Sequence, residues 1–148
     1  MRALLQRTTR ACVRVNGATV GAIGPGLVVF VGVGPADDVT TADGLARRIA
    51  ELRIFRDEEG RTNRSLLEVE GSALVISQFT LFADTHRGRR PGFTGAASPD
   101  HAERLYLRLA DALRAHDVQV ATGRFGSEMQ VELVNDGPFT IWLDTVSP

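Results

Sequence analysis

The chain has 148 residues, of which 43% are hydrophobic and 24% charged, a composition typical of one globular domain spanning residues 1–148. Seventeen basic residues nearly balance eighteen acidic ones, and the resulting net charge of −1 argues against a long phosphate-binding track. The longest apolar run, Leu27–Val33, is too short to cross a bilayer, and the first residues do not resemble a secretory leader, which predicts a cytoplasmic protein with no membrane partner.

The first part of the chain predicts a hairpin followed by a buried strand. Asn16-Gly17 supplies the positive φ angles of a tight turn between strands at Ala11–Val15 and Ala18–Ile23. Leu27–Val33 is apolar on both faces, which indicates a central strand of a sheet.

Two helices are predicted, each by a cap residue followed by apolar residues at helical spacing. Thr40 is the expected N-cap of the first helix. Ser98 is the expected N-cap of the second, with Pro99 at the first helical position, where its missing N–H costs nothing. The buried faces consist of Leu45, Ile49 and Leu52 in the first helix and Leu105, Leu109 and Leu113 in the second.

Further strands are predicted around these helices, and Asn63–Glu70 gives no clear pattern. The strands are Arg53–Arg56, Leu74–Phe82, Glu128–Val134 and Phe139–Leu143. The last two are separated by Asn135–Pro138, which reads as an interruption. Because strands predominate and two helices are inserted among them, we expect an α+β fold: a curled or barrel-like, mostly antiparallel sheet with both main helices on one side.

The usual motifs of metal-dependent and triad hydrolases do not occur. The three histidines, His86, His101 and His116, form no paired metal motif, and Cys12 has no second cysteine as partner. The chain has no GxSxG elbow, and Gly32-Val33-Gly34 is too short to indicate a dinucleotide site. We therefore expect no metal and no cofactor, and either a binding protein or an enzyme that uses main-chain groups and its own substrate.

Two segments carry the candidate chemistry. Ser77-Gln78-Phe79-Thr80-Leu81 follows an apolar strand, so it forms either the polar face of that strand or a site whose main-chain N–H groups stabilise an oxyanion. Asn135-Asp136-Gly137-Pro138 is either a hairpin turn or a functional loop. A Gly-Pro bond can be cis at a cost of about 0.5–1 kcal/mol, which would reorient two carbonyl groups toward an ammonium ion.

A third segment, His86-Arg87-Gly88-Arg89-Arg90, is the one concentrated basic patch. It is either a solvated loop or a local binding site for one end of an RNA.

The sequence SQFTL at Ser77–Leu81 together with NDGP at Asn135–Pro138 resembles the signature pair of the D-aminoacyl-tRNA deacylase family. The resemblance extends over essentially the whole chain and includes Thr122–Gly126. It departs mildly at Phe82, Gly92 and Phe139, where a tyrosine, a serine and a smaller aliphatic residue are expected.

The resemblance implies hydrolysis of the ester between a D-amino acid, or glycine, and the 3′ end of tRNA by a homodimer. Each subunit would insert a cis Gly137–Pro138 bond opposite the partner's Ser77–Thr80. The Gly137 and Pro138 carbonyls would hold the substrate ammonium, and an L side chain would collide with this main chain. The implied catalytic residues are Ser77, Gln78, Phe79 and Thr80, and the implied substrate-binding residues are Gly137, Pro138, Arg7 and Met129. In this reading Arg7 braces the Gly-Pro loop, although the alternatives are a surface arginine at residue 7 and a core methionine at residue 129.

Two mechanisms and two other functions stay open at this point. Thr80 could be the nucleophile, or the free 2′-hydroxyl of the terminal adenosine could activate a water while main-chain N–H groups hold the oxyanion. The alternative function is that of a non-catalytic dimeric protein that binds an RNA end. A further alternative is an esterase that does not discriminate between D- and L-amino acids.

Overall fold

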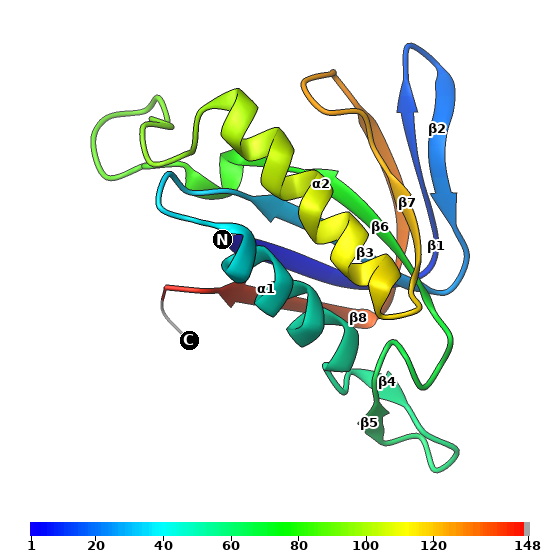
Figure 1. Ribbon diagram of the computed structural model, residues 1–148. Helices are drawn as coiled ribbons and strands as arrows, with labels where there is room; N and C mark the ends of the chain where they lie inside the picture. The colour runs from blue at the N-terminus through cyan, green and yellow to red at the C-terminus, as the bar shows by residue number, and fades with distance from the viewer. Residues whose placement is uncertain (147–148) are drawn as a thin grey trace.

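A computed structural model of the protein describes residues 1–146 and shows a strongly curved sheet with both α-helices on one face (Figure 1). The strands are β1 (Arg2–Val15), β2 (Ala18–Ile23), β3 (Gly26–Gly32), β4 (Phe55–Arg56), β5 (Thr62–Arg64), β6 (Ser72–Ser77), β7 (Gln119–Thr122) and β8 (Gln130–Asp144). The helices are α1 (Val39–Glu51), the short 3₁₀ helix η1 (Phe79–Phe82) and α2 (Pro99–Ala115). The predicted α+β class with a barrel-like sheet is confirmed. Among the helices of residues 1–146, none combines the length and apolar character that a membrane span needs.

Strand β1 pairs in antiparallel fashion with three strands. Its N-terminal half pairs with β3, its C-terminal half pairs with β2, and β8 runs along both halves. The turn to β2 has positive φ at Asn16 (49°) and Gly17 (79°), as the sequence predicts. The sheet nearly closes, because a Cβ on Gly21 of β2 would lie 2.5 Å from the Thr122 carbonyl oxygen of β7.

Strands β3, β6 and β7 are parallel neighbours, in contrast to the antiparallel pairs around β1. Helix α1 lies in the connection from β3 to β6, and α2 in the connection from β6 to β7. The carboxyl ends of the three strands therefore lie at one edge of the sheet. The sequence did not predict β7, which has only four residues and no clear alternation of polar and apolar side chains.

The core has two parts, one on each face of the sheet. On the helix side, the predicted stripe of α2 is fully buried, as are Leu45 and Ile49 of α1. On the other side, Val28 and Leu74 pack inside the curl against half-buried residues of β8. Because both faces are covered, β3 and the interior of β6, Ala73–Ile76, are apolar, which explains why Leu27–Val33 reads as a central strand.

Both predicted helices are present, but the capping contacts at their N-termini differ from those expected. Asp38, and not Thr40, caps α1, because its carboxylate accepts a hydrogen bond from the Thr41 N–H at 2.8 Å. Ser98 does occupy the N-cap of α2, with Pro99 next to it, but its side chain makes no capping hydrogen bond.

Several predicted strand limits are wrong. The strand expected at Arg53–Arg56 is only the two-residue β4, and it pairs with β5, which begins just before the unassigned segment. The strand expected at Leu74–Phe82 ends at Ser77, where the chain turns into η1. Asn135–Pro138 does not interrupt the last strand. Two register irregularities absorb the extra residues, and β8 stays paired with β1 on both sides of them.

Candidate functional site

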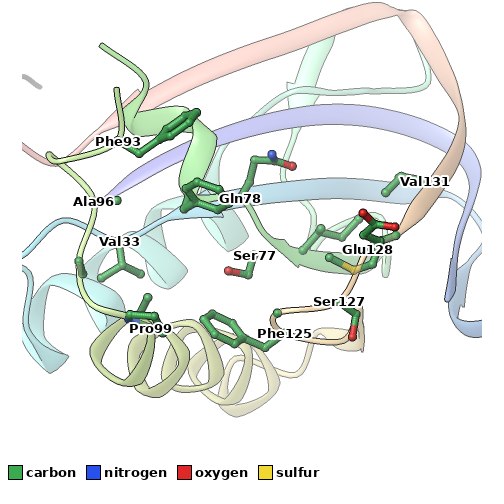
Figure 2. Close-up of a pocket in the computed structure, with 16 residues that line it drawn as sticks. Val33, Ser77, Gln78, Phe93, Ala96, Pro99, Phe125, Ser127, Glu128 and Val131 are labelled. Carbon is green, nitrogen blue, oxygen red and sulfur yellow. The ribbon is translucent and has the colours of Figure 1, made fainter. Parts of the chain in front are cut away.

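A pocket of about 600 Å³ opens at the carboxyl ends of β3, β6 and β7 (Figure 2). Figure 2 shows Ser77 pointing into it, with Pro99 and Phe125 on one side and Phe93 on the other. The lining residues are Val33, Ile76, Ser77, Gln78, Phe79, Phe93, Ala96, Ala97, Pro99, Ala102, Phe125, Gly126, Ser127, Glu128, Met129 and Val131. Ligands of sheets with parallel strands commonly bind at such ends.

The predicted catalytic segment forms one wall of this pocket. Ser77 ends β6 opposite Val31, and the Gln78 N–H donates to the Val31 carbonyl at 2.7 Å. Gln78 then turns the chain, with φ −143° and ψ 78°, into η1. The N–H groups of Phe79 and Thr80 begin this helix, and within residues 1–146 they have no hydrogen-bond partner. One of these two main-chain donors belongs to a lining residue of the pocket, Phe79, and the other belongs to its neighbour Thr80.

Thr80 lies outside the pocket lining and is exposed. Its hydroxyl accepts a hydrogen bond from the Gln78 side-chain amide. The histidines lie elsewhere: His86 bonds to Asp84, His101 Nε2 lies 2.9 Å from the Asp37 carbonyl, and His116 lines a second cavity at the far end of α2. None of the three histidines is therefore hydrogen-bonded to this threonine.

Titratable groups contribute little to the pocket. Glu128 is its one charged lining residue. Residues 1–146 contain no group of three His, Cys, Asp or Glu side chains arranged to hold a metal ion.

Arg7 of β1 is buried beside the Gly-Pro loop, Asn135–Pro138 of β8, with 3% of its surface exposed. Its Nη1 donates to the Ile54 carbonyl at 2.6 Å. Its Nε lies 3.2 Å from the Asp136 carbonyl oxygen and 3.1 Å from the Asp136 carboxylate. The guanidinium also lies 4.7 Å from the ring centre of Phe139. Arg7 therefore contacts the loop on both sides of the Gly-Pro pair.

The expectation of a cis bond before Pro138 is wrong for this structure, because residues 1–146 contain no cis peptide bond. The trans form is the ordinary isomer of an X–Pro bond. Gly137 has a φ of +115°, a main-chain conformation that residues with a side chain rarely adopt. A Cβ on Gly137 would also lie 2.6 Å from Arg7 Nη2, so any other residue at this position would displace the end of the arginine side chain.

The structure brings only some of the predicted residues together. Ser77, Gln78, Phe79 and Met129 line one pocket, whereas none of Asn135–Pro138 lines it. The loop lies farther along β8, opposite Thr8 of β1. Within one chain, the two candidate segments therefore form separate surfaces.

Sequence reasoning assigned no role to the aromatic walls of the pocket. Phe93 packs edge-on against Phe79, with ring centres 5.0 Å apart and an interplanar angle of 70°. Phe125 packs on Tyr106 of α2 at 6.1 Å. Phe93 lies in a loop whose local pattern gives no signal, but Phe125 belongs to the Thr122–Gly126 stretch that resembles the family.

The family model and two similar curated relatives indicate one family. The family described as D-Tyr-tRNA(Tyr) deacylase matches residues 4–144. The D-aminoacyl-tRNA deacylase of Dinoroseobacter shibae is 60% identical over 97% of this chain and 99% of its own length. That of Paracoccus denitrificans is 55% identical over 98% and 97%. The solved structure of a c-Myc DNA Unwinding Element Binding Protein is similar with a TM-score of 0.92 and 36% identity, covering 98% of this chain and 99% of the other.

The Arg7 contacts predict how the loop depends on this side chain. Arg7→Met keeps the apolar stem but leaves the Ile54 and Asp136 carbonyls without their donor, so the free energy of unfolding should fall by about 2–3 kcal/mol. Arg7→Lys should not restore it, because an ammonium lacks the planar fork. Urea unfolding measures the loss, and hydrogen exchange should accelerate across residues 135–139.

Arg10→Met on the same strand is the matched control, because Arg10 is exposed, and it should change stability by less than about 0.5 kcal/mol. Equal effects of the two variants would contradict the bracing role.

Proposed function

The chain belongs to the D-Tyr-tRNA(Tyr) deacylase family, and on this premise we propose that it hydrolyses the ester bond of D-aminoacyl-tRNA to free tRNA and a D-amino acid. The observation that carries the proposal is the pocket at the ends of three parallel strands, with the N–H groups of its lining residue Phe79 and of the adjacent Thr80 left without a partner among residues 1–146. A tRNA substrate also agrees with the cytoplasmic location expected from the sequence.

We propose a mechanism that uses the substrate's own 2′-hydroxyl. This group activates a water, whose oxygen attacks the ester carbonyl carbon. The negative charge that develops on the carbonyl oxygen is stabilised by the N–H groups of Phe79 and Thr80. The bond from the carbonyl carbon to the 3′ oxygen then breaks, and that oxygen takes up the proton released by the water. No protein side chain has to act as nucleophile, which agrees with the surroundings of Thr80.

Substitutions at residues 79 and 80 separate side chain from main chain. Thr80→Ala keeps the N–H, so kcat should stay within about threefold of the parent, whereas loss of a true nucleophile would cost more than about a thousandfold. Phe79→Pro removes an N–H at the first position of η1, a helix position at which proline is common.

Phe79→Ala is the control for the lost ring in the proline variant. Relative to this control, Phe79→Pro should lower kcat by about 10²–10³. Single-turnover hydrolysis of D-Tyr-tRNA measures both effects, and an inactive but folded Thr80→Ala would contradict the mechanism.

We propose that the complete site requires two copies of the chain, with the Gly137–Pro138 loop of one copy covering the pocket of the other. Supporting this, the loop is remote from the pocket of its own chain. Strand β8, which carries the loop, also exposes Trp142 (48%) and Val134 (40%), apolar surface that a second copy would bury.

In the proposed dimer, discrimination comes from the main chain. The Gly137 and Pro138 carbonyls accept hydrogen bonds from the substrate ammonium, and the ester lies against Phe79 and Thr80. With these two ends fixed, a D side chain points to solvent and an L side chain meets the Gly-Pro main chain. Each 1.4 kcal/mol of this overlap excludes the L ester by another factor of about ten. Glycine has no side chain to exclude, so glycyl-tRNA is also a substrate.

Hydrolysis of three esters tests the function. The protein should release the amino acid from D-Tyr-tRNA and glycyl-tRNA, and should cut L-Tyr-tRNA at least about a hundredfold more slowly. Pro138→Ala loosens the wall and should raise the rate on the L ester while leaving the D ester less affected.

Equal rates of cleavage of D-Tyr-tRNA and L-Tyr-tRNA would indicate a general esterase. If Pro138→Ala excludes the L ester as well as the parent does, the discrimination does not come from this loop.

Mixing two inactive variants tests the contribution of the loop in trans. In the first variant, Ser77→Phe, the new ring fills the pocket. In the second, residues 137–138 are deleted, which removes the loop. Because two residues are removed, the later side chains of β8 stay on the same faces of the sheet. When the two variants are dissociated together and allowed to reassociate, half of the dimers should contain one copy of each. One of the two sites in such a dimer is complete, so the mixture should recover roughly a quarter of the parental activity. No recovery from two folded, associating variants would show that each chain uses its own loop.

A second candidate function is nucleic-acid binding without catalysis. The unpaired arginines of the His86–Arg90 loop favour it, as does the similarity to a protein whose name describes DNA binding. The hydrolysis experiment distinguishes the two functions, because a non-catalytic binding protein releases tyrosine from neither the D nor the L ester.

A further inference from the structure

The segment Asp84–Gly92 forms a closed loop beside the pocket. Asp84 and Gly92 exchange main-chain hydrogen bonds of 2.7 and 2.9 Å, which fasten the two ends of the loop together. Asp84 also accepts hydrogen bonds from the main-chain N–H and the ring of His86, and these bonds lower the pKa of its carboxyl. Figure 1 shows the loop projecting beyond η1 and the first turn of α2.

This loop concentrates positive charge that nothing nearby neutralises. Between Asp84 and Asp100 the sequence contains no acidic residue. Arg87, Arg89 and Arg90 are exposed, and within residues 1–146 they make no hydrogen bond or ion pair.

Arginines elsewhere in the chain are commonly paired. Arg108 forms two 2.7 Å bonds with Asp43, and Arg114 contacts Asp111 at 2.8 Å. Because the chain carries a net charge of −1, the excess positive charge at the loop is a local feature and not a general property of the surface.

The loop is connected directly to the pocket at both ends. It follows η1, which carries Phe79, and it leads into Phe93. These two rings contact each other at 5.0 Å, and both line the pocket. A ligand that fills the pocket and continues outward past these rings would therefore meet the basic loop next.

We propose that Arg87, Arg89 and Arg90 bind phosphates of the nucleotides that precede the terminal adenosine of the aminoacyl-tRNA. The proposal rests on the proposed function, which brings the 3′ end of that RNA into the pocket. A guanidinium binds phosphate through paired N–H donors and keeps its charge at every physiological pH. The contact is independent of sequence, so it adds affinity for any tRNA without reading bases.

The test compares two triple variants with the same change in charge. One is Arg87→Gln/Arg89→Gln/Arg90→Gln. The control is Arg47→Gln/Arg48→Gln/Arg56→Gln, which removes three exposed arginines from α1 and β4, two elements that contribute no residue to the pocket lining. The measurements are the Kd of uncharged tRNA by fluorescence anisotropy from about 50 to about 200 mM salt, and the kcat/KM for D-Tyr-tRNA and for the D-tyrosyl ester of adenosine alone.

The loop variant should lose roughly 2 from the slope of log Kd against log salt, about 0.7 for each lost contact with single-stranded phosphate. Between about 50 and about 200 mM salt, the affinity of the parent should therefore fall roughly 20-fold more than that of the loop variant, and at low salt the variant should have the lower kcat/KM on tRNA. Both variants should cleave the adenosine ester like the parent.

Binding of tRNA by the loop variant that equals that of the parent would overturn the proposal, as would an equal loss in the control variant or an equal loss on the adenosine ester. If the parent cleaves neither ester while the loop variant still loses tRNA affinity, the proposed function fails and the phosphate contact stands.

Discussion

The simultaneous pairing of β1 with three strands is the constraint on which both candidate segments depend. Its N-terminal half fixes β3, and β3 in turn sets β6 and β7 parallel to itself, so that three strand ends form the floor of one pocket. The same strand carries Arg7, which its register with β8 brings beside Asp136. A slip of one residue would turn Arg7 to the opposite face of the sheet and separate it from the loop.

The pocket that results is made largely of apolar side chains and main-chain groups. This favours a reaction in which positioning matters more than side-chain acid–base chemistry, and an aminoacyl ester is activated enough for such a reaction. The turn at Gln78 is central to this, because it ends the strand and frees the N–H groups of Phe79 and Thr80 at the rim. Had β6 continued to Phe82, as the sequence suggests, those donors would point sideways from the strand, as sheet-pairing groups do, and would not begin a helix.

Sequence reasoning succeeded where local patterns decide the structure and failed where tertiary contacts decide it. The apolar spacing of Leu105, Leu109 and Leu113 correctly gave the buried face of α2. The end of β6 could not be foreseen, because Phe79 leaves the strand to pack against Phe93, fourteen residues later in the chain. In the same way Asn135–Pro138 looks like a break, but pairing with β1 on both sides carries the strand through it. The site segments themselves were identified by resemblance, since the residues alone left each of them open between a structural and a functional reading.

The trans bond before Pro138 changes what the proposed discrimination requires. Without an unusual isomer, the wall has to exclude an L side chain by being stiff, because a loop that moves aside by a few tenths of an ångström relieves the overlap. Two contacts supply this stiffness from within the chain: Arg7 anchors Asp136, and the Asn135 amide donates to the Arg7 and Phe139 carbonyls at 2.8 and 3.0 Å. The discrimination would then depend on a residue that never touches the substrate. Gly137 belongs to the same arrangement, because a Cβ there would lie 2.6 Å from Arg7 Nη2 and would displace the guanidinium that anchors Asp136.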